Sequence, residues 1–148
     1  MYDTYMKQSP TDRRPAKHFT LSLLEAANSV SEKLEGGLAE LGLSMAKQSA
    51  LTALADAGEP LTLSDLAARL SCVRSNITQL VDRLEADGLV RRVDDPADRR
   101  SVRAELTSTG VEKQVAGEAA IAKVQHDIAR QISAADLIGL ESALGALG

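Results

Sequence analysis

Residues 88–107 read GLVRRVDDPADRRSVRAELT and predict a short strand, a charged turn and a second strand. Apolar and charged residues alternate from Val102 to Leu106, which is the period of a half-buried strand, and Asp95-Pro96 marks the turn. A helical pattern with a polar outer face, residues 74–87, comes directly before this hairpin. A helix that can enter one DNA groove, followed by a basic hairpin that can reach the next, predicts a DNA-reading unit.

The composition is that of a globular protein. The chain has 148 residues, of which 44% are hydrophobic and 26% charged, so one domain with its own core is expected. No apolar run approaches the roughly 20 residues of a membrane helix, and the polar start lacks a signal-peptide pattern. A single cysteine excludes an internal disulfide framework. We therefore expect a cytoplasmic protein without a membrane partner.

The charge is spread unevenly. A net charge of −4 counts against a protein that coats any nucleic acid through a basic surface. Between residues 69 and 103, however, the sequence contains eight arginines and only six acidic residues. This small local excess permits a sequence-specific reader.

Two helices are expected before the DNA-reading unit. Apolar residues recur every three or four positions over residues 17–41 and predict a long helix, which Gly36-Gly37 should bend or interrupt. The polar residues 1–16 are expected to form a flexible arm. Residues 44–57 predict a second helix that stops at Gly58. Its inward-facing residues should be Leu51, Leu54 and Ala55.

A helix-turn-helix pattern follows. Thr62 and Asp65 have the spacing of a capping box and open a short helix, after which a tight turn leads into the helix of residues 74–87. The apolar stripe of that second helix consists of Ile77, Leu80, Val81 and Leu84. Its opposite, outward side consists of Ser75, Gln79, Asp82 and Ala86. The fold class is therefore mainly α with a small β-hairpin wing.

Two more helices follow the hairpin and point to a dimer. Thr107 or Ser108 should cap a long helix that reaches about Gln131, and Ser133 opens a last, leucine-striped helix. The first helix and these last two carry apolar surface that packing against a second copy would bury. A two-fold dimer would present two recognition helices roughly 34–36 Å apart, one DNA turn. The alternative is a monomeric bundle.

Four segments in this order resemble the MarR family of bacterial transcription regulators. They are LTLSDLAARL (61–70), ITQLVDRLEADGLV (77–90), DPADRR (95–100) and LTSTG (106–110). The resemblance implies one MarR-like domain over residues 1–148, with a winged helix-turn-helix lobe at 44–107 flanked by dimerisation helices at 17–41 and 108–148. It also implies a homodimeric repressor on a palindromic promoter site, released by a small phenolic or otherwise amphipathic ligand. Other members respond through cysteine oxidation.

The resemblance assigns the wing three roles. Arg100 is expected in the minor groove, where the negative potential is strongest. Asp98 would hold that guanidinium in position, and Arg99 would lie against a phosphate. The alternative is a solvated charged turn.

The recognition helix supplies the other DNA-binding candidates, which are Arg74, Ser75, Asn76, Thr78 and Gln79. Gln and Asn pair bidentately with adenine, and Arg pairs with guanine. One or two of the five are expected only to cap or solvate the helix. Thr62 could contact a backbone phosphate, although its capping role explains it equally well. Val73 stands where family members often have a polar cap, and Ser71 would supply the cap instead, with the turn slightly rearranged.

The remaining functional classes find less support. Cys72, near a helix N-terminus, could be an oxidisable thiol, but a small buried hydrophobe is the favoured interpretation. His18 is a weak candidate for lining a ligand pocket, and two histidines with one cysteine predict no metal site. No catalytic motif is present, so neither an enzyme nor a cofactor is expected. The alternatives to a DNA-binding regulator are a redox switch at Cys72 and a winged-helix module that binds protein.

Overall fold

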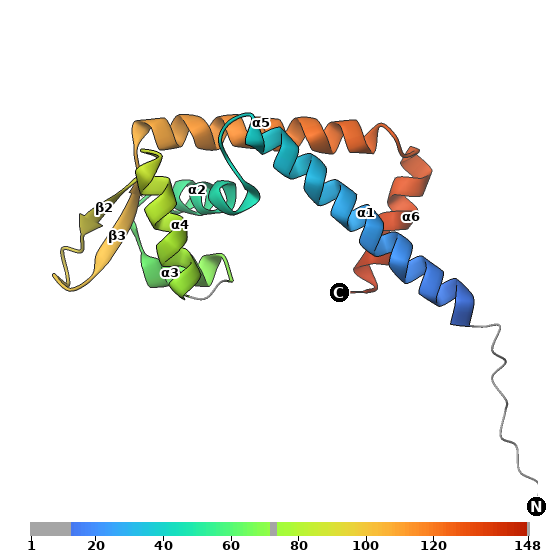
Figure 1. Ribbon diagram of the computed structural model, residues 1–148, viewed down its shortest axis with the longest axis horizontal. Coiled ribbons are helices and arrows are strands. Elements are labelled where there is room, and N and C mark those ends of the chain that lie inside the picture. The colour runs from blue at the N-terminus through green and yellow to red at the C-terminus, as the bar shows by residue number, and fades with distance from the viewer. Residues whose placement is uncertain (1–12, 72–73, 148) are drawn as a thin grey trace, which may run out of the picture. The chain divides into compact units, whose positions relative to one another are not determined.

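The computed structural model describes residues 13–71 and 74–147 (Figure 1). The chain divides into two compact units, Met1–Lys33 and Leu34–Gly148, and the boundary falls inside the first helix. The elements in chain order are α1 (Arg13–Ala39), α2 (Met45–Ala57), β1 (Leu61–Thr62), α3 (Leu63–Arg69), α4 (Arg74–Ala86), β2 (Val90–Asp94), β3 (Val102–Leu106), α5 (Ser108–Ala129) and α6 (Ala134–Gly145). The predicted fold class, mainly α with a winged helix-turn-helix lobe, is confirmed.

The predicted hairpin forms, and it is part of a larger sheet. Strands β2 and β3 pair antiparallel with Val90 opposite Leu106 and Asp94 opposite Val102. A third strand, β1, pairs with the other edge of β3, so that the order is β1-β3-β2. We did not predict β1, because two residues are too few to show a strand period.

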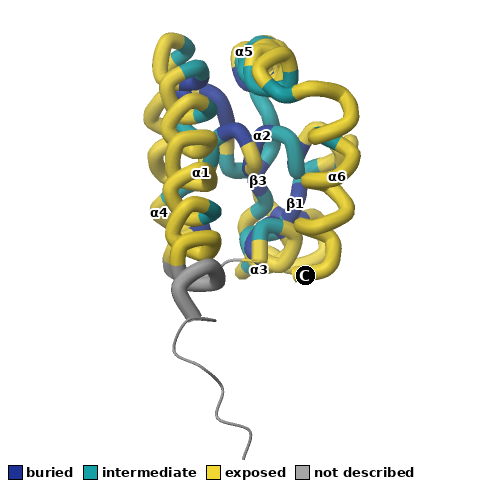
Figure 2. The backbone as a smooth tube through the Cα atoms, turned by 90° about the vertical axis from the view of Figure 1, so that its right-hand side faces the viewer, coloured by how far each residue is buried: buried dark blue, intermediate teal, exposed yellow. Residues whose placement is uncertain are grey.

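The core of the second unit lies where α2, α3, α4 and the sheet meet. The stripe of α4 is buried, with Ile77, Val81 and Leu84 at 0% exposure, and Leu80 packs against it in part. Other fully or nearly buried apolar residues are Leu38, Leu43, Ala50, Leu51, Leu54, Leu61, Leu66, Ala67, Leu89, Val90 and Ala104. Figure 2 shows the burial concentrated in α2 and the strands. The apolar spacing read from the sequence therefore fixes which face of α4 points outward.

Polar caps begin most of these helices. Ser44, Thr62, Thr107 and Ser133 each accept a hydrogen bond from the backbone N–H three residues later, which satisfies a donor that the first helical turn leaves open. Thr107 rather than Ser108 therefore caps α5. At the other end of α4, Gly88 adopts a φ of 72°, and the Leu89 N–H returns to the Leu84 carbonyl. This left-handed glycine turns the chain from α4 into β2.

Three local predictions are wrong. Helix α1 begins at Arg13, so the last residues of the expected arm are helical, and residues 1–12 lie outside the described part. Of the bend or interruption expected at Gly36-Gly37, the interruption does not occur, since α1 runs through both residues. Gly37 lets α5 approach, because a Cβ there would lie 3.0 Å from a methyl of Val124. Ala55 is exposed, and Gln48 is buried on α2 in its place, where its amide donates to the Gln114 carbonyl of α5.

Helix α6 has no buried residue, and all of its residues except the half-buried Leu137 are exposed (Figure 2). Ile138 is 70% exposed, and leucines of the predicted stripe are also exposed. No helix within residues 13–71 and 74–147 combines the length and the apolar character that crossing a bilayer requires.

Candidate nucleic-acid interface

The outer face of α4 carries polar side chains next to a buried stripe. Asn76, Thr78 and Gln79 are exposed, while Ile77 between them is fully buried. Because the stripe anchors α4 in the core, these three polar residues are held facing outward. Arg74 and Ser75 form the first turn of α4, but their side chains, like all of Cys72 and Val73, lie outside the described residues.

The two acidic residues of α4 share one arginine of the wing. Arg92 on β2 forms ion pairs with Asp82 and Glu85, and its backbone N–H donates to the Glu85 carboxylate at 3.1 Å. The charges that would otherwise repel a phosphate are therefore paired, and they connect the second half of α4 to the sheet. The exposed residues Asn76, Thr78 and Gln79 in the first two turns of α4 are polar and uncharged.

The wing loop is built from two turns closed by aspartates. The Asp95 carboxylate accepts the Ala97 N–H at 3.0 Å, and the Asp98 carboxylate accepts the Arg100 N–H at 2.9 Å. A backbone hydrogen bond from Ser101 N–H to the Asp98 carbonyl closes the tip. Both turns follow the tendency of aspartate to bond the backbone two residues further on.

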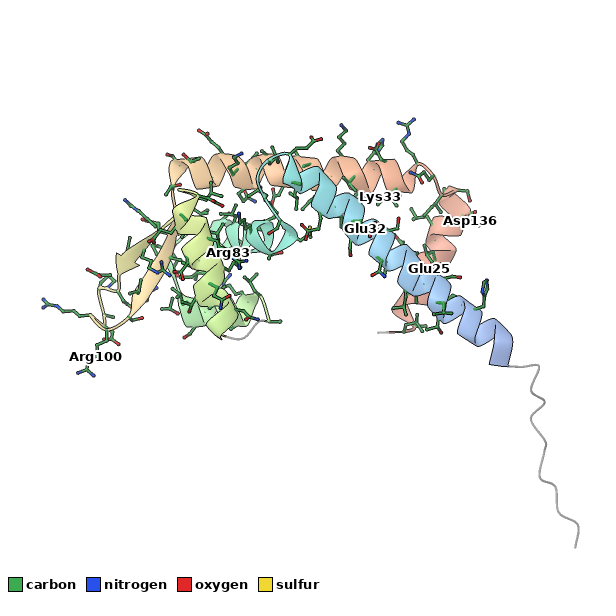
Figure 3. All side chains as sticks on the ribbon, viewed as in Figure 1. Glu25, Glu32, Lys33, Arg83, Arg100 and Asp136 are labelled. Atoms are coloured by element: carbon green, nitrogen blue, oxygen red, sulfur yellow. The ribbon has the colours of Figure 1, made fainter. Side chains whose placement is uncertain are left out.

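Arg99 and Arg100 are exposed at this tip. In Figure 3 the Arg100 side chain projects from the loop between β2 and β3 toward solvent. Asp98 was expected to hold the Arg100 guanidinium, but the hydrogen bond that its carboxylate accepts from Arg100 comes from the backbone N–H. The carboxylate thus shapes the loop that carries Arg100.

Most wing arginines form ion pairs with acidic side chains of the same chain. Arg91 donates to Glu105 across the strands at 2.6 Å, Arg92 pairs with α4, and the Nε of Arg103 lies 3.2 Å from Asp95 Oδ2. The local excess of arginine in the sequence therefore overstates the charge available to a ligand. Within the described part of the wing, Arg99 and Arg100 are the arginines left without an internal ion pair.

A hollow of about 240 Å³ brings predicted site residues from three elements together. Thr62 at the start of α3, Thr78 on α4 and Arg100 from the wing all line it, and Arg92 contributes a second guanidinium. The hydroxyl residues of this lining and the Arg100 guanidinium, which has no internal ion pair, suit an anionic oxygen such as that of a phosphate, whereas Arg92 is already paired with Asp82 and Glu85. We did not predict Arg92 here, because its strand position gave no indication of which face it occupies.

Asp95 is the one charged residue buried in the described part of the wing, with 7% of its surface exposed. The Ala97 N–H lowers the pKa of its carboxyl, burial opposes that effect, and the Arg103 guanidinium adds to the lowering. The carboxylate is therefore ionised at neutral pH and holds Arg103.

The other candidates are not brought to this surface. His18 is exposed on α1, in the first unit. Within the described residues, no group of three or more potential metal ligands gathers. A second hollow, of about 470 Å³, lies between α2, the end of α3 and α5. Its lining includes Met45, Gln48, Asp56, Arg69 and Ile121.

Comparison with known proteins identifies the lobe. Residues 43–102 match the model of the MarR family. The HTH-type transcriptional regulator PrsX of Escherichia coli is 32% identical over 97 residues, which cover 64% of this chain and 58% of PrsX. The matches to curated relatives span between 34% and 58% of those proteins' lengths. Such relatives are named as regulators and not as enzymes, which agrees with the sequence prediction.

Two solved structures extend the likeness to nearly the whole chain. AbsC, a MarR family transcriptional regulator from Streptomyces coelicolor, has a TM-score of 0.75 and 27% identity, with 90% of this chain and 92% of AbsC covered. RdhR, an organohalide-sensing regulator solved in its 2,4-dichlorophenol-bound form, has a TM-score of 0.77 and 20% identity. The match covers 99% of this chain and 88% of RdhR. At 20% identity the similarity to RdhR supports the fold alone.

Proposed function

Because residues 43–102 match the MarR family model, we propose that this chain is a MarR family transcriptional regulator that binds double-stranded DNA in a sequence-specific manner. The observation that carries the proposal is the convergence of Thr62, Thr78 and Arg100 on one hollow beside the exposed face of α4. Three elements distant in sequence contribute to one surface whose chemistry suits a sugar-phosphate backbone.

The roles of the side chains follow from their places. The first turns of α4, with Arg74, Ser75, Asn76, Thr78 and Gln79, enter the major groove. Arg100 reaches the adjacent minor groove, Asp98 shapes its loop, and Arg99 and Thr62 contact phosphates. Only two unpaired wing arginines serve this purpose, so binding depends on them strongly.

The working form is a homodimer that represses transcription from a palindromic promoter site. The support is the exposed apolar surface of α5 and α6, where Val115 is 57% and Ile138 is 70% exposed. Exposed apolar surface of this kind is typical of interfaces. Two-fold symmetry of the protein then requires two-fold symmetry of the site. Because it acts on promoters, we place the protein in the cytoplasm.

A small amphipathic or phenolic ligand releases the DNA. The hollow between α2, α3 and α5 supports this proposal, because its volume of about 470 Å³ suits a small aromatic molecule. It is lined by apolar Met45 and Ile121 together with the polar Gln48 and Arg69. A thermal-shift titration with 2,4-dichlorophenol tests this site, with Ile121→Trp as the variant that fills it. A shift of equal size in that variant would place the ligand elsewhere.

Selection from a random duplex library tests the DNA-binding proposal. The full chain is expected to enrich a palindromic sequence, and Arg100→Ala should bind that sequence more weakly at matched salt. A chain that enriches no duplex but captures a protein through the same face would be an interaction module. If the enriched duplex is released by peroxide from the parent and not from Cys72→Ser, the thiol switch replaces the small-molecule ligand.

A further inference from the structure

The Arg103 side chain connects two parts of the proposed DNA surface, the segment that leads into Thr62 and the wing loop. Arg103 lies in the central strand of the sheet, opposite Thr62 of β1 and Val93 of β2. Its Nη1 donates to the Pro60 carbonyl at 3.0 Å, and its Nε lies 3.2 Å from Asp95 Oδ2. The guanidinium therefore spans from the segment that leads into Thr62 to the root of the wing loop.

Asp95 fixes where that loop begins. Its carboxylate accepts the Ala97 N–H, and its own N–H donates to the Ser101 carbonyl at 3.2 Å. The five residues between Asp95 and Ser101 carry Arg99 and Arg100. Any movement of Asp95 therefore moves the tip of the wing.

This contact differs from the other ion pairs of the sheet. Arg91 and Glu105 are paired with side chains 66% and 32% exposed, and such surface pairs contribute little to stability. The Asp95 side chain is 7% exposed, and removing the partner of a buried charge is strongly unfavourable. A hollow of about 390 Å³ flanks the pair, lined by Glu59, Pro60, Val93 and Arg103 among others. On the side of this hollow the start of the wing loop is not held by close packing, so the ion pair between Arg103 and Asp95 holds it.

We propose that Arg103 and Asp95 are positioning residues, which hold the wing at the angle where Arg100 meets DNA without touching DNA themselves. This inference rests on the proposed function. The Nε–Oδ2 contact is an ion pair without the alignment of a hydrogen bond, so the position of the guanidinium depends on the additional bond to Pro60. Lysine keeps the charge but has a single ammonium group, and it cannot reproduce this two-sided contact.

A double-mutant cycle on the selected duplex tests the proposal. Arg103→Met should weaken binding roughly tenfold, within the range that Arg100 itself contributes, and Arg103→Lys should weaken it less. In a background that carries both Arg99→Ala and Arg100→Ala the same substitutions should change affinity by less than about twofold, because the wing-tip side chains that they position are gone. Arg91→Met is the matched control on the same sheet and should stay within about twofold of the parent.

The salt dependence separates positioning from contact. A residue that binds phosphate contributes a slope of about one to the logarithmic salt dependence. In an Arg99→Ala background, where the phosphate contact of the wing tip is already removed, Arg103→Met should leave that slope unchanged. Additive effects of Arg103→Met and the Arg99→Ala, Arg100→Ala pair, or a slope reduced by about one in the Arg99→Ala background, would overturn the proposal. If Arg103→Met fails to fold, Asp95→Asn and Arg103→Lys complete the cycle.

A measurement without DNA keeps this inference distinct from the proposed function. In a Cys72→Ser background, spin labels at Ala97 on the wing and at Asp56 on α2 report the wing position. Arg103→Met should broaden their distance distribution, and Arg91→Met should not. If no duplex is selected, the proposed function fails, and this distribution alone decides whether Arg103 positions the wing. An unchanged distribution would refute the positioning role.

Discussion

Truncating Arg100 is expected to weaken DNA binding without weakening the fold. The side chain is exposed on the loop between β2 and β3, and the hydrogen bond that Arg100 makes to Asp98 comes from its backbone N–H. Arg100→Ala keeps that N–H. The free energy of unfolding should therefore change by no more than about 0.5 kcal/mol.

The cost to DNA binding follows from the pairing of the other wing arginines. A guanidinium in a DNA groove contributes roughly 1–3 kcal/mol. Arg91, Arg92 and Arg103 are held in internal ion pairs, so Arg99 is the one neighbouring wing cation in the described structure that could compensate. We therefore expect a loss of about 2 kcal/mol, which is roughly a 30-fold rise in Kd.

Fluorescence anisotropy on the selected duplex at matched salt measures this loss. Arg130→Ala removes the same charge from the exposed C-terminal end of α5 and should change Kd by less than about twofold, since screening limits the effect of a distant charge. Equal losses in the two variants would mean that binding follows net charge alone. An unchanged Kd for Arg100→Ala would refute the assignment of the wing.

Three further perturbations test separate parts of the structure. Gly110→Ala should lower the free energy of unfolding by about 1–3 kcal/mol in a urea titration, because its Cβ would lie 1.9 Å from the Leu89 carbonyl oxygen. An unchanged urea midpoint would show that the first turn of α5 shifts to accommodate the methyl group at little cost. The folded-state pKa of Asp95 is lowered, so its stabilisation is complete above the unfolded pKa of about 3.9 and is lost as the pH falls through the folded value. The stability difference between the parent and Asp95→Asn should therefore be constant near neutral pH and shrink below about pH 4, and a difference independent of pH would contradict this. Gln79→Ala should relax base preference at one position of each half-site in a repeated selection, and an unaltered motif would remove Gln79 from the base contacts.

The sequence predicted the elements whose signals are local. The alternation from Val102 to Leu106 and the stripe from Ile77 to Leu84 each repeat within one element, and both elements formed as expected. Caps such as Thr62 are local for the same reason, since donor and acceptor lie three residues apart.

Features that depend on distant partners were not predictable. Gly36-Gly37 was expected to bend or interrupt α1, but the helix is continuous, and the small size of Gly37 matters for its contact with Val124 on α5, which no local pattern reveals. Gln48 is buried because Gln114 accepts its hydrogen bond from 66 residues away. The neutralisation of Arg92 and Arg103 likewise depends on which strand face each occupies relative to α4 and to Pro60. Counting arginines along the chain could not separate those that stabilise the wing from those that are free.

Tethered cleavage of the selected duplex tests the central claim most directly, because it reports which element lies in which groove. A cleaving reagent is attached to a cysteine introduced at Arg99 or at Asn76, each in a Cys72→Ser background. The account predicts major-groove cuts inside each half-site from position 76 and minor-groove cuts beside the half-sites from position 99. The same cuts from both positions, or cuts no stronger than those from a reagent at Arg130, would contradict it.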